Sequence, residues 1–490
     1  MRKDIIKTKL DKLENLKRAG MEVYPEKVER SFANSEALDK FDNIKDKIFL
    51  AGRIRSLRPM GKSAFAHIED ESGKIQLFLS EKNIGKEKYK LFVKNIEIGD
   101  FIQAEGNLFK TKTGEKTLEV NDWKILSKNM RPIPAEYYGI KDTEELLRKR
   151  YLDILINPET KEIFKKKNVF WQTVRNFLSE RGFLETQTPV LENVPGGAEA
   201  RPFITRHNIL SRDFYLRISL ELSLKKLLIG GYEKVFEIGR VFRNEGIDRE
   251  HLQEFDHMEF YWAYADMEKG MELVEKMFKA IVKNVAGVQN DGKKLITKHS
   301  GKEIIWSDDF PRLDYFEELK KETGIDLNKN ISVEGLKKKA DELEIKYKDS
   351  YGKGRMIDTL YKKTVRKKLI QPCFLTGHPI EVSPLAKKDP DNPKKVLRFQ
   401  PIACQSELGN GFSELNDPLE QRKRFEEQMK LRKAGDEEAQ MMSEDFVEAL
   451  EYGMPPAAGF GMSERLFAIL MDRPVRETVI FPPMKEHTTP

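Results

Sequence analysis

The sequence has few cysteines and no long apolar run. Its 490 residues include only Cys373 and Cys404, without paired spacing, which excludes a disulfide framework and a CxxC zinc site. No apolar stretch approaches the roughly 18 residues of a membrane-spanning helix, and residues 1–20 lack the apolar core of a secretory signal. We therefore expect a cytoplasmic protein in a reducing compartment, with no membrane segment.

The common phosphate-binding loops are also missing. The chain contains neither a GxxxxGK[ST] loop nor a GxGxxG motif after a predicted strand, and it has no internal repeat. P-loop and Rossmann nucleotide folds are therefore excluded, because both need a glycine-rich cradle for the phosphates. If this protein binds a nucleotide, we expect arginine side chains to hold it.

The composition is that of a large protein with a well-solvated surface. Hydrophobic residues make up 39% and charged residues 34% of the chain, and the length predicts two or three domains with full cores. The 87 Lys and Arg residues exceed the 81 Asp and Glu residues, giving a net charge of +6. Such a mild excess permits a polyanionic partner without requiring one.

The periodicity predicts four successive regions. Residues 1–45 are predicted to form a helical extension, and five short alternating segments with glycine turns in 46–130 indicate a closed β-barrel of the OB-fold type. Prolines mark a linker at 131–145. Residues 146–490 predict an α+β domain on a mainly antiparallel sheet with flanking helices, and its charged stretch at about 290–370 is expected to be a helical insertion.

The most informative segment is the predicted two-stranded ribbon from Val235 to Trp262. Alternation along the first strand puts Arg243 and Glu245 on one face, and the second strand puts Phe255, Glu259 and Tyr261 on a matching face. An ordinary half-buried hairpin would show apolar side chains there. The pattern therefore predicts a floor for a charged, planar ligand.

Four motifs occur in a fixed order along the chain. They are RGFLETQTPVL with PGGAEARPF, VFRNEGIDREH with EFDHMEFY, ELGNGFSELNDP, and the closing GFGMSERL. With these motifs the chain resembles the class II lysyl-tRNA synthetases over nearly its whole length. The resemblance implies that lysine and ATP give lysyl-adenylate, that the lysyl group moves to the 3′ end of tRNA(Lys), that Mg²⁺ is the cofactor, and that a homodimer forms around Pro189.

The resemblance also implies roles for individual residues. Arg243 and Arg465 would be the catalytic arginines, and the ATP site would add Glu245, His251 and Phe255 to them. The lysine site would combine Arg243 with Gly197, Glu221, Glu259, Tyr261, Asn410, Phe412 and Glu414. A buried charge is tolerated only when it is paired, so we expect the two ammonium groups of lysine to balance these glutamates.

The implied metal site and motifs depart from the family in three places. Glu407 would bind Mg²⁺, but the second metal-binding glutamate is replaced by Gln400, which offers a carbonyl oxygen without charge. Leu252 replaces an asparagine near the ATP, and the closing motif before Arg465 is one residue short.

The barrel would bind the anticodon in the family's manner. Phe65 and Phe78 would stack on bases, and Gln76 would read a base edge. The same two phenylalanines could instead fill the core of the barrel, and the pattern alone does not decide between these positions.

Three other functions stay open at this point. The chain could ligate aspartate or asparagine, although the acidic Glu414 argues against an acidic substrate. It could be a synthetase-derived RNA-binding or regulatory protein with impaired catalysis, which the three departures favour. A lysyl-transferase that acts on a protein is disfavoured by the anticodon-type barrel.

Overall fold

The computed structural model describes residues 2–134, 142–246, 252–287, 294–436 and 438–484. The chain divides into two compact units, residues 1–141 and residues 142–490, which we treat separately. None of the helices in these described ranges is long and apolar enough to cross a membrane.

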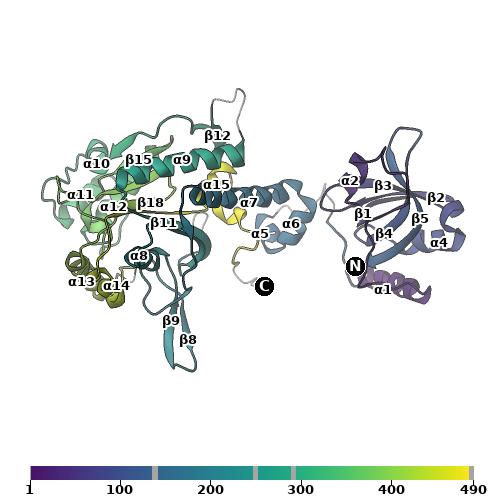
Figure 1. Cartoon of the computed structure of the whole chain (residues 1–490), viewed down its shortest axis with the longest axis horizontal. Coiled ribbons are helices and arrows are strands. Elements are labelled where there is room, and N and C mark those ends of the chain that lie inside the picture. The colour runs from purple at the N-terminus through teal and green to yellow at the C-terminus, as the bar shows by residue number, and fades with distance from the viewer. Residues whose placement is uncertain (1, 135–141, 247–251, 288–293, 437, 485–490) are drawn as a thin grey trace. The chain divides into compact units, whose positions relative to one another are not determined.

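The smaller unit is a closed five-stranded barrel (Figure 1). Its strands follow the order β1-β2-β3-β5-β4, and only β3 and β5 pair in parallel. This arrangement confirms the predicted OB-fold. The elements are β1 (Ile48–Met60), β2 (Ser63–Glu69), β3 (Lys74–Ser80), β4 (Phe101–Lys110), β5 (Lys116–Ser127), α1 (Arg2–Arg18), α2 (Asn34–Asp39), α3 (Glu81–Ile84) and α4 (Lys86–Asn95).

Strict alternation in β2 and β3 decides which side chains fill the barrel. Ala64, Ala66 and Ile68 are fully buried in the barrel core, whereas Phe65 between them is half-buried on the outer face. Phe78 lies on the same outer face, directly opposite Phe65 in the strand register. The reading of these phenylalanines as barrel core is therefore wrong.

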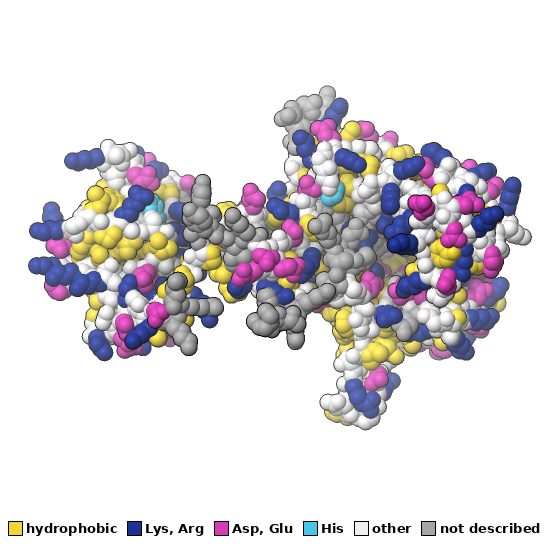
Figure 2. Space-filling model, turned by 180° about the vertical axis from the view of Figure 1, so that it is seen from behind, with side chains coloured by type: hydrophobic (Ala, Val, Ile, Leu, Met, Phe, Trp, Pro, Cys, Tyr) yellow, Lys and Arg dark blue, Asp and Glu magenta, His cyan; other side chains and the backbone are white. Residues whose placement is uncertain are grey.

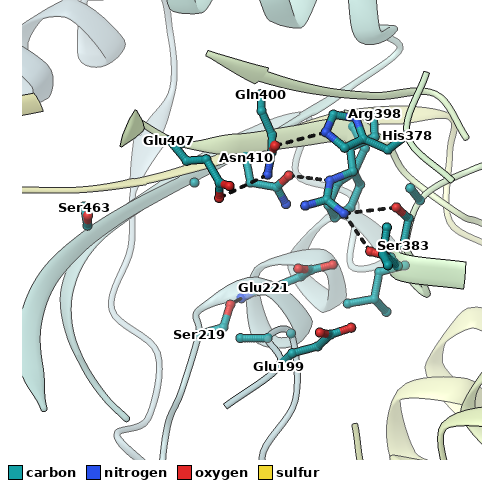
Figure 3. A pocket seen from close by; sticks show the side chains of 18 of the residues that line it. Glu199, Ser219, Glu221, His378, Ser383, Arg398, Gln400, Glu407, Asn410 and Ser463 are labelled. Atoms are coloured by element: carbon teal, nitrogen blue, oxygen red, sulfur yellow. Dashed lines mark hydrogen bonds between the residues drawn. The ribbon is translucent and has the colours of Figure 1, made fainter. Parts of the chain in front are cut away.

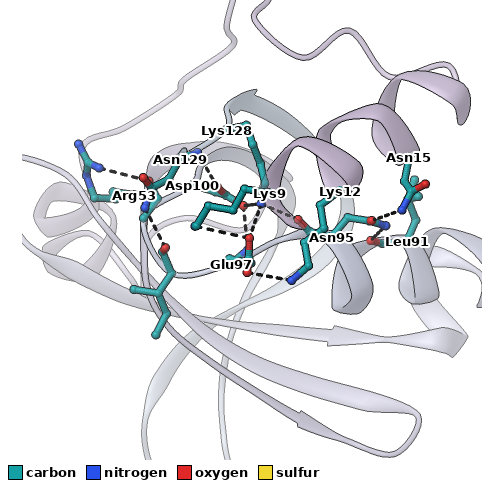
Figure 4. Close-up of polar contacts among 12 residues, drawn as sticks. Lys9, Lys12, Asn15, Arg53, Leu91, Asn95, Glu97, Asp100, Lys128 and Asn129 are labelled. Atoms are coloured by element: carbon teal, nitrogen blue, oxygen red, sulfur yellow. Dashed lines mark hydrogen bonds and ion pairs between the residues drawn. The ribbon is translucent and has the colours of Figure 1, made fainter. Parts of the chain in front are cut away.

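A buried charge cluster fastens helix α1 to the barrel (Figure 4). Lys12 of α1 donates to Glu97 at 2.8 Å, and the fully buried Lys128 bonds both Glu97, at 3.0 Å, and Asp100, at 2.8 Å. Burial alone would raise the pKa of Glu97, but Lys12 and Lys128 lower it to about 2. These charges are compensated within the unit, so they serve its folding.

The larger unit is built on one long sheet of order β14-β15-β16-β18-β19-β11-β10-β6, with β17 beside β16. Its pairs are antiparallel except at the two ends, where β14 pairs with β15 and β10 with β6 in parallel. The predicted mainly antiparallel α+β fold is confirmed. The strands β7, β8 and β9 form a separate small sheet, and β12 and β13 form a hairpin. The strands of this unit are β6 (Leu184–Glu185), β7 (Leu191–Glu192), β8 (Ile204–His207), β9 (Arg212–Leu216), β10 (Lys234–Phe242), β11 (Glu254–Ala263), β12 (Ile296–His299), β13 (Lys302–Ile305), β14 (Arg312–Asp314), β15 (Cys373–Thr376), β16 (Arg398–Ala403), β17 (Ser406–Glu407), β18 (Asn410–Ser413) and β19 (Ala457–Ser463).

Helices cover both faces of this sheet. On one face α7 and α9 pack on Phe260 and Phe460 in the largest core cluster, and on the other face α8, α13 and α14 pack on Tyr261 and Phe412. The helices are α5 (Thr143–Arg148), α6 (Arg150–Ile156), α7 (Pro158–Ser179), α8 (Glu221–Ile229), α9 (Met267–Ala286), α10 (Tyr315–Thr323), α11 (Val333–Glu342), α12 (Lys353–Thr364), α13 (Pro418–Lys433), α14 (Glu444–Glu451) and α15 (Arg465–Leu470), with 3₁₀ turns η1 (Arg366–Lys368), η2 (Ile380–Val382) and η3 (Val475–Thr478).

Two sequence expectations need correction here. The stretch 290–370 is not purely helical, because it also carries the hairpin β12–β13 and the edge strand β14 of the main sheet. The first strand of the ribbon ends at Phe242, so Arg243 and Glu245 follow the strand instead of lying on its face. The Arg243 amide donates to the Gln253 carbonyl at 2.8 Å, and the chain leaves the ribbon after this hydrogen bond.

Candidate active site

A cavity of about 730 Å³ lies on the sheet face that α8 covers. Side chains from β11, β18 and β19 form its floor, and the beginning of α8, the residues after β10 and helix α12 form its walls. Charged side chains of both signs and amide groups reach it, and Figure 3 shows Glu221, Arg398 and Glu407 converging from three different elements. The cavity therefore suits a polar ligand with charges of both signs.

The cationic part of the cavity contains Arg243 and Arg465. Arg243 stacks over the Phe255 ring at 5.2 Å, and its Nε donates to the Ile218 carbonyl at 3.2 Å. Arg465 begins helix α15 directly after β19 and donates from Nη1 to the Glu407 carbonyl at 3.2 Å. The closing motif thus brings its arginine into the cavity although it is one residue short, and Glu245 lines the same region.

Glu259 is held by three donors at the centre of the cavity floor. Its Oε1 accepts from the Ser219 hydroxyl at 2.6 Å and from the Leu220 amide at 2.9 Å, and its Oε2 accepts from the Tyr261 hydroxyl at 2.8 Å. Burial lowers the pKa of the neighbouring His257 to about 3, so this imidazole is neutral. Tyr261, expected at the far end of lysine, therefore also orients Glu259.

The anionic end of the cavity contains a cation that the sequence reasoning missed. Lys225 of α8 is completely buried, donates to Glu221 Oε1 at 2.6 Å and contacts Glu414 Oε2. The expectation that a ligand alone would balance the three glutamates is therefore wrong. Within the described chain, Glu414 Oε1 is buried beside Gly459 of the cavity lining and has no hydrogen-bond partner.

Asn410, Phe412 and Gly197 complete this end. Arg398 donates from Nε to the Asn410 amide oxygen at 2.7 Å, so Asn410 can offer its amide nitrogen to the cavity, and Phe412 lines it beside Lys225. Gly197 has a φ of +83°, and a Cβ there would lie 2.8 Å from Glu221 Cβ. Six of the seven residues expected at lysine besides Arg243 thus line one cavity, and Glu414 is buried behind Gly459 of its lining.

The carboxylate of Glu407 lies among cations. Burial raises the pKa of Glu407, but Lys362, Arg366 and Arg465 outweigh burial and hold it below its usual value. Arg366 Nη1 lies 3.1 Å from Glu407 Oε1. Glu407 therefore stays ionised and can serve as a ligand for a divalent cation.

Gln400 does not fit the role of a second metal ligand (Figure 3). Its amide oxygen lies 3.0 Å from His378 Nε2, and its amide nitrogen faces Glu407 Oε2 at 3.5 Å. Because only the nitrogen can donate to a carboxylate, Glu407 fixes this orientation. The oxygen expected to coordinate a metal is turned away. In the described ranges no three His, Cys, Asp or Glu side chains cluster as a metal site.

The remaining sequence expectations lie elsewhere. His251, expected at the phosphates, lies outside the described residues. Leu252 is buried against Ala468 and Val475 and does not line the cavity. An apolar side chain packs well at that position, so this departure stabilises the segment after the ribbon loop.

Sequence reasoning also missed the wall that helix α12 contributes. Arg355 and Lys362 of α12 and Arg366 just after it line the cavity. The sequence predicts only a charged helical insertion here, because lysines and arginines in such number are typical of an exposed helix. The buried Tyr315 and Tyr361, which stack at 4.7 Å, were the available signal that one face of this segment is covered.

The residues expected at the anticodon lie together on the outer face of the barrel. The Phe65 and Phe78 rings are 5.1 Å apart, Phe109 extends the row at 6.0 Å, and Gln76 donates to Thr117 Oγ1 at 2.9 Å. Figure 2 shows hydrophobic side chains gathered on one face of this unit with Lys and Arg side chains around them. This surface offers stacking and positive charge together.

Comparison with known proteins identifies the family. Residues 142–485 match the family model described as tRNA synthetases class II (D, K and N), and residues 48–126 match that of the OB-fold nucleic acid binding domain. The chain is 42% identical to a lysine–tRNA ligase of Halalkalibacterium halodurans, over 99% of this chain and 98% of that protein. It is 39% identical to that of Bacillus subtilis, over 99% and 97%, and 41% identical to that of Thermotoga maritima, over 99% and 97%. The chain therefore belongs to the lysine–tRNA ligases, class II aminoacyl-tRNA synthetases with an N-terminal OB-fold domain.

Proposed function

We propose that this protein activates L-lysine with ATP and transfers the lysyl group to the 3′ end of tRNA(Lys). The observation that carries the proposal is the division of one cavity into two ends. Arg243 and Arg465 provide positive charge at one end, and Glu221 and Glu259 provide negative charge at the other, with Glu414 buried behind Gly459. A substrate with a carboxylate and two ammonium groups matches this division.

Arg243, at the cationic end, lies close enough to Glu259 for their charges to interact. Its planar guanidinium can bind the lysine carboxylate and the α-phosphate together, which holds the attacking oxygen in line with phosphorus. The carboxylate is already ionised, so the step requires no general base. The neutral His257 beneath Arg243 adds no competing positive charge. Positioning and charge stabilisation therefore account for the rate.

The lysine ligands divide between its two ends. Glu259 and Glu221 would bind the α-amino group beside Gly197, and the free oxygen of Glu414 would bind the ε-ammonium. Phe412 would line the aliphatic stem, and the Asn410 amide would join Arg243 on the carboxylate. At the nucleotide, Phe255 would stack on the adenine, with Glu245 near its amino group.

Glu407 would hold Mg²⁺ together with phosphate oxygens and water, a ligand set that this ion accepts. The ion would offset negative charge on the phosphates during displacement. Gln400 is left out of this proposal, because its amide oxygen lies at His378. We propose that one carboxylate of this chain, instead of two, serves the ion.

The alternatives fit less well. A ligase for aspartate would need an unpaired cation near Glu414, and Lys225 there is already engaged by two carboxylates. A regulatory protein without catalysis would not need the complete set of cavity residues. The aromatic row on the barrel disfavours a lysyl-transferase that acts on a protein, since exposed stacking rings suit bases.

We also propose that the protein is a cytoplasmic homodimer whose interface includes the segment around Pro189. Several large apolar side chains near this segment are exposed, which is unusual on a surface that stays in water. These side chains are Leu184, Val190, Leu191 and Ile204. A mass of one chain in solution by light scattering would contradict the dimer.

The test of the proposed function is amino-acid-dependent exchange of pyrophosphate into ATP, measured with lysine, ornithine, arginine, aspartate and asparagine. We expect exchange with lysine and only background exchange with aspartate and asparagine. Absence of exchange with lysine refutes the proposal. Exchange with lysine but no charging of tRNA(Lys) would refute its second step.

A further inference from the structure

Lys225 is a buried cation that pairs with two of the glutamates at the anionic end. It has no exposed surface, and its ammonium lies 2.6 Å from Glu221 Oε1 and in contact with Glu414 Oε2. Three aromatic rings surround it, with centroids 5.4 Å away in Phe412, 5.8 Å in Tyr261 and 5.9 Å in Phe446. An ammonium so enclosed is held by its two carboxylates and by the ring faces.

A count of charges relates Lys225 to the substrate. Glu221 and Glu259 line the anionic end, Glu414 is buried behind it, and Lys225 bonds Glu221 and contacts Glu414. Lysine would bring two further ammonium groups to these carboxylates. Without Lys225, one carboxylate would remain uncompensated even with lysine bound.

We infer that Lys225 is a positioning residue for the amino-acid substrate, whose ammonium holds the carboxylates of Glu221 and Glu414 in place at the anionic end of the cavity. This inference rests on the proposed function. Lys225 itself does not contact the reacting atoms. It contacts one oxygen of Glu414 and leaves the other oxygen to the ε-ammonium of the substrate.

Protonation is the competing fate of these carboxylates. Burial raises the pKa of Glu221 to about 7 and that of Glu414 well above its usual value, although Lys225 opposes the rise in both. The other groups that face them are Glu259, which raises both values, Arg398, which lowers that of Glu221, and the Tyr261 hydroxyl, which is bonded to Glu259. Loss of Lys225 therefore raises both pKa values further, and a neutral carboxylic acid no longer attracts an ammonium group.

The test compares Lys225→Met with the wild-type enzyme in lysine-dependent pyrophosphate exchange from about pH 6 to 8.5. Methionine preserves the length and the apolar stem of lysine while removing the charge. At pH 7 we expect the KM for lysine to rise about tenfold or more, as for coupled neighbouring charges, with little change in kcat or in the KM for ATP. The acid limb of kcat/KM for lysine should move to higher pH.

Lys226→Met is the matched control. Lys226 is the next residue of α8, it is partly exposed, and it pairs with Asp445 at the surface. We expect wild-type kinetics and an unchanged pH profile from it. If Lys225→Met melts before the assay temperature, the double variant Lys225→Met/Glu221→Gln takes its place, since removing one charge of each sign leaves no additional uncompensated carboxylate.

The outcomes separate this inference from the proposed function. No lysine-dependent exchange by the wild-type enzyme refutes the proposed function. Two outcomes refute the inference when the wild type shows exchange. One is an unchanged KM for lysine in folded Lys225→Met, and the other is a KM for lysine that Lys225→Met raises equally at every pH. A weaker defect in the double variant than in Lys225→Met supports it, and a deeper defect that is independent of pH contradicts it.

Discussion

Gly459 of β19 leaves space for the ligand where the floor of the cavity passes Glu414 and Tyr261. A Cβ at this position would lie 2.1 Å from Glu414 Oε1 and 2.5 Å from Tyr261 Cε1. Both separations are far below van der Waals contact. The Gly459→Ala variant therefore adds one methyl group at the oxygen that we assign to the ε-ammonium of lysine.

The expected loss follows from the packing. Tyr261 is buried among Phe412 and Lys225 and cannot move freely, so the carboxylate of Glu414 has to rotate away. Overpacking of this kind costs about 1–3 kcal/mol. If most of this free energy falls on lysine binding, the KM for lysine rises roughly five- to hundredfold, because 1.4 kcal/mol corresponds to a factor of ten. The KM for ATP should change little.

The assay is pyrophosphate exchange at varied lysine and fixed ATP, with thermal unfolding measured in parallel. Gly352→Ala is the control, because a Cβ there has no heavy atom within 4 Å. Gly352 precedes helix α12 and has φ of −76°, which alanine adopts readily. A wild-type lysine KM for folded Gly459→Ala would show that Glu414 and Tyr261 do not contact the lysine side chain.

Two further predictions concern pH and the barrel. Burial raises the pKa of Glu464 to about 7, although Lys167 bonds it at 2.7 Å. Ionised Glu464 therefore lowers the stability of the fold increasingly as pH rises from about 5 to 7. The melting temperature of Glu464→Gln, relative to that of the wild type, should rise over this interval, and a constant difference between the two melting temperatures would contradict a raised pKa. Replacing Phe65 by alanine should weaken tRNA binding by about 1–3 kcal/mol per lost stack. Lysine-dependent pyrophosphate exchange should stay at the wild-type level. An unchanged tRNA affinity in filter binding would show that Phe65 does not contact the tRNA.

The barrel and the ribbon could be read from the sequence because local rules decide both. Ala64, Ala66 and Ile68 alternate with Phe65 and His67, and this period of two is the same in the sequence and in the barrel wall. What the pattern lacked was the direction of each face, since Phe65 is as apolar as the residues that fill the core. The small alanines on the other face were the available indication, because a barrel interior has little room for two opposed phenylalanines.

The end of the first ribbon strand could not be read in the same way. The alternation continues through Arg243 and Glu245, yet the ladder stops at Phe242. A strand ends where its partner ends, and the partner strand begins only at Glu254. Similarly, the lysines and arginines after residue 350 are typical of a solvated helix, and only the tertiary packing of Tyr315 on Tyr361 turns Arg355 and Lys362 toward the cavity.

Lys225 shows most clearly what a sequence leaves out. Glu221 and Lys225 stand four positions apart on a helix, a spacing that usually indicates a weak pair on an exposed surface. The pair is buried because Glu414 and Phe412, from a distant strand, close over it. The protein thus contributes one ammonium group of its own to a site built for the ammonium groups of its substrate. Each carboxylate of Glu414 and Glu221 has two oxygens, so one can face Lys225 and the other the ligand. Recognition of the lysine substrate then depends on Lys225, a lysine of the protein itself.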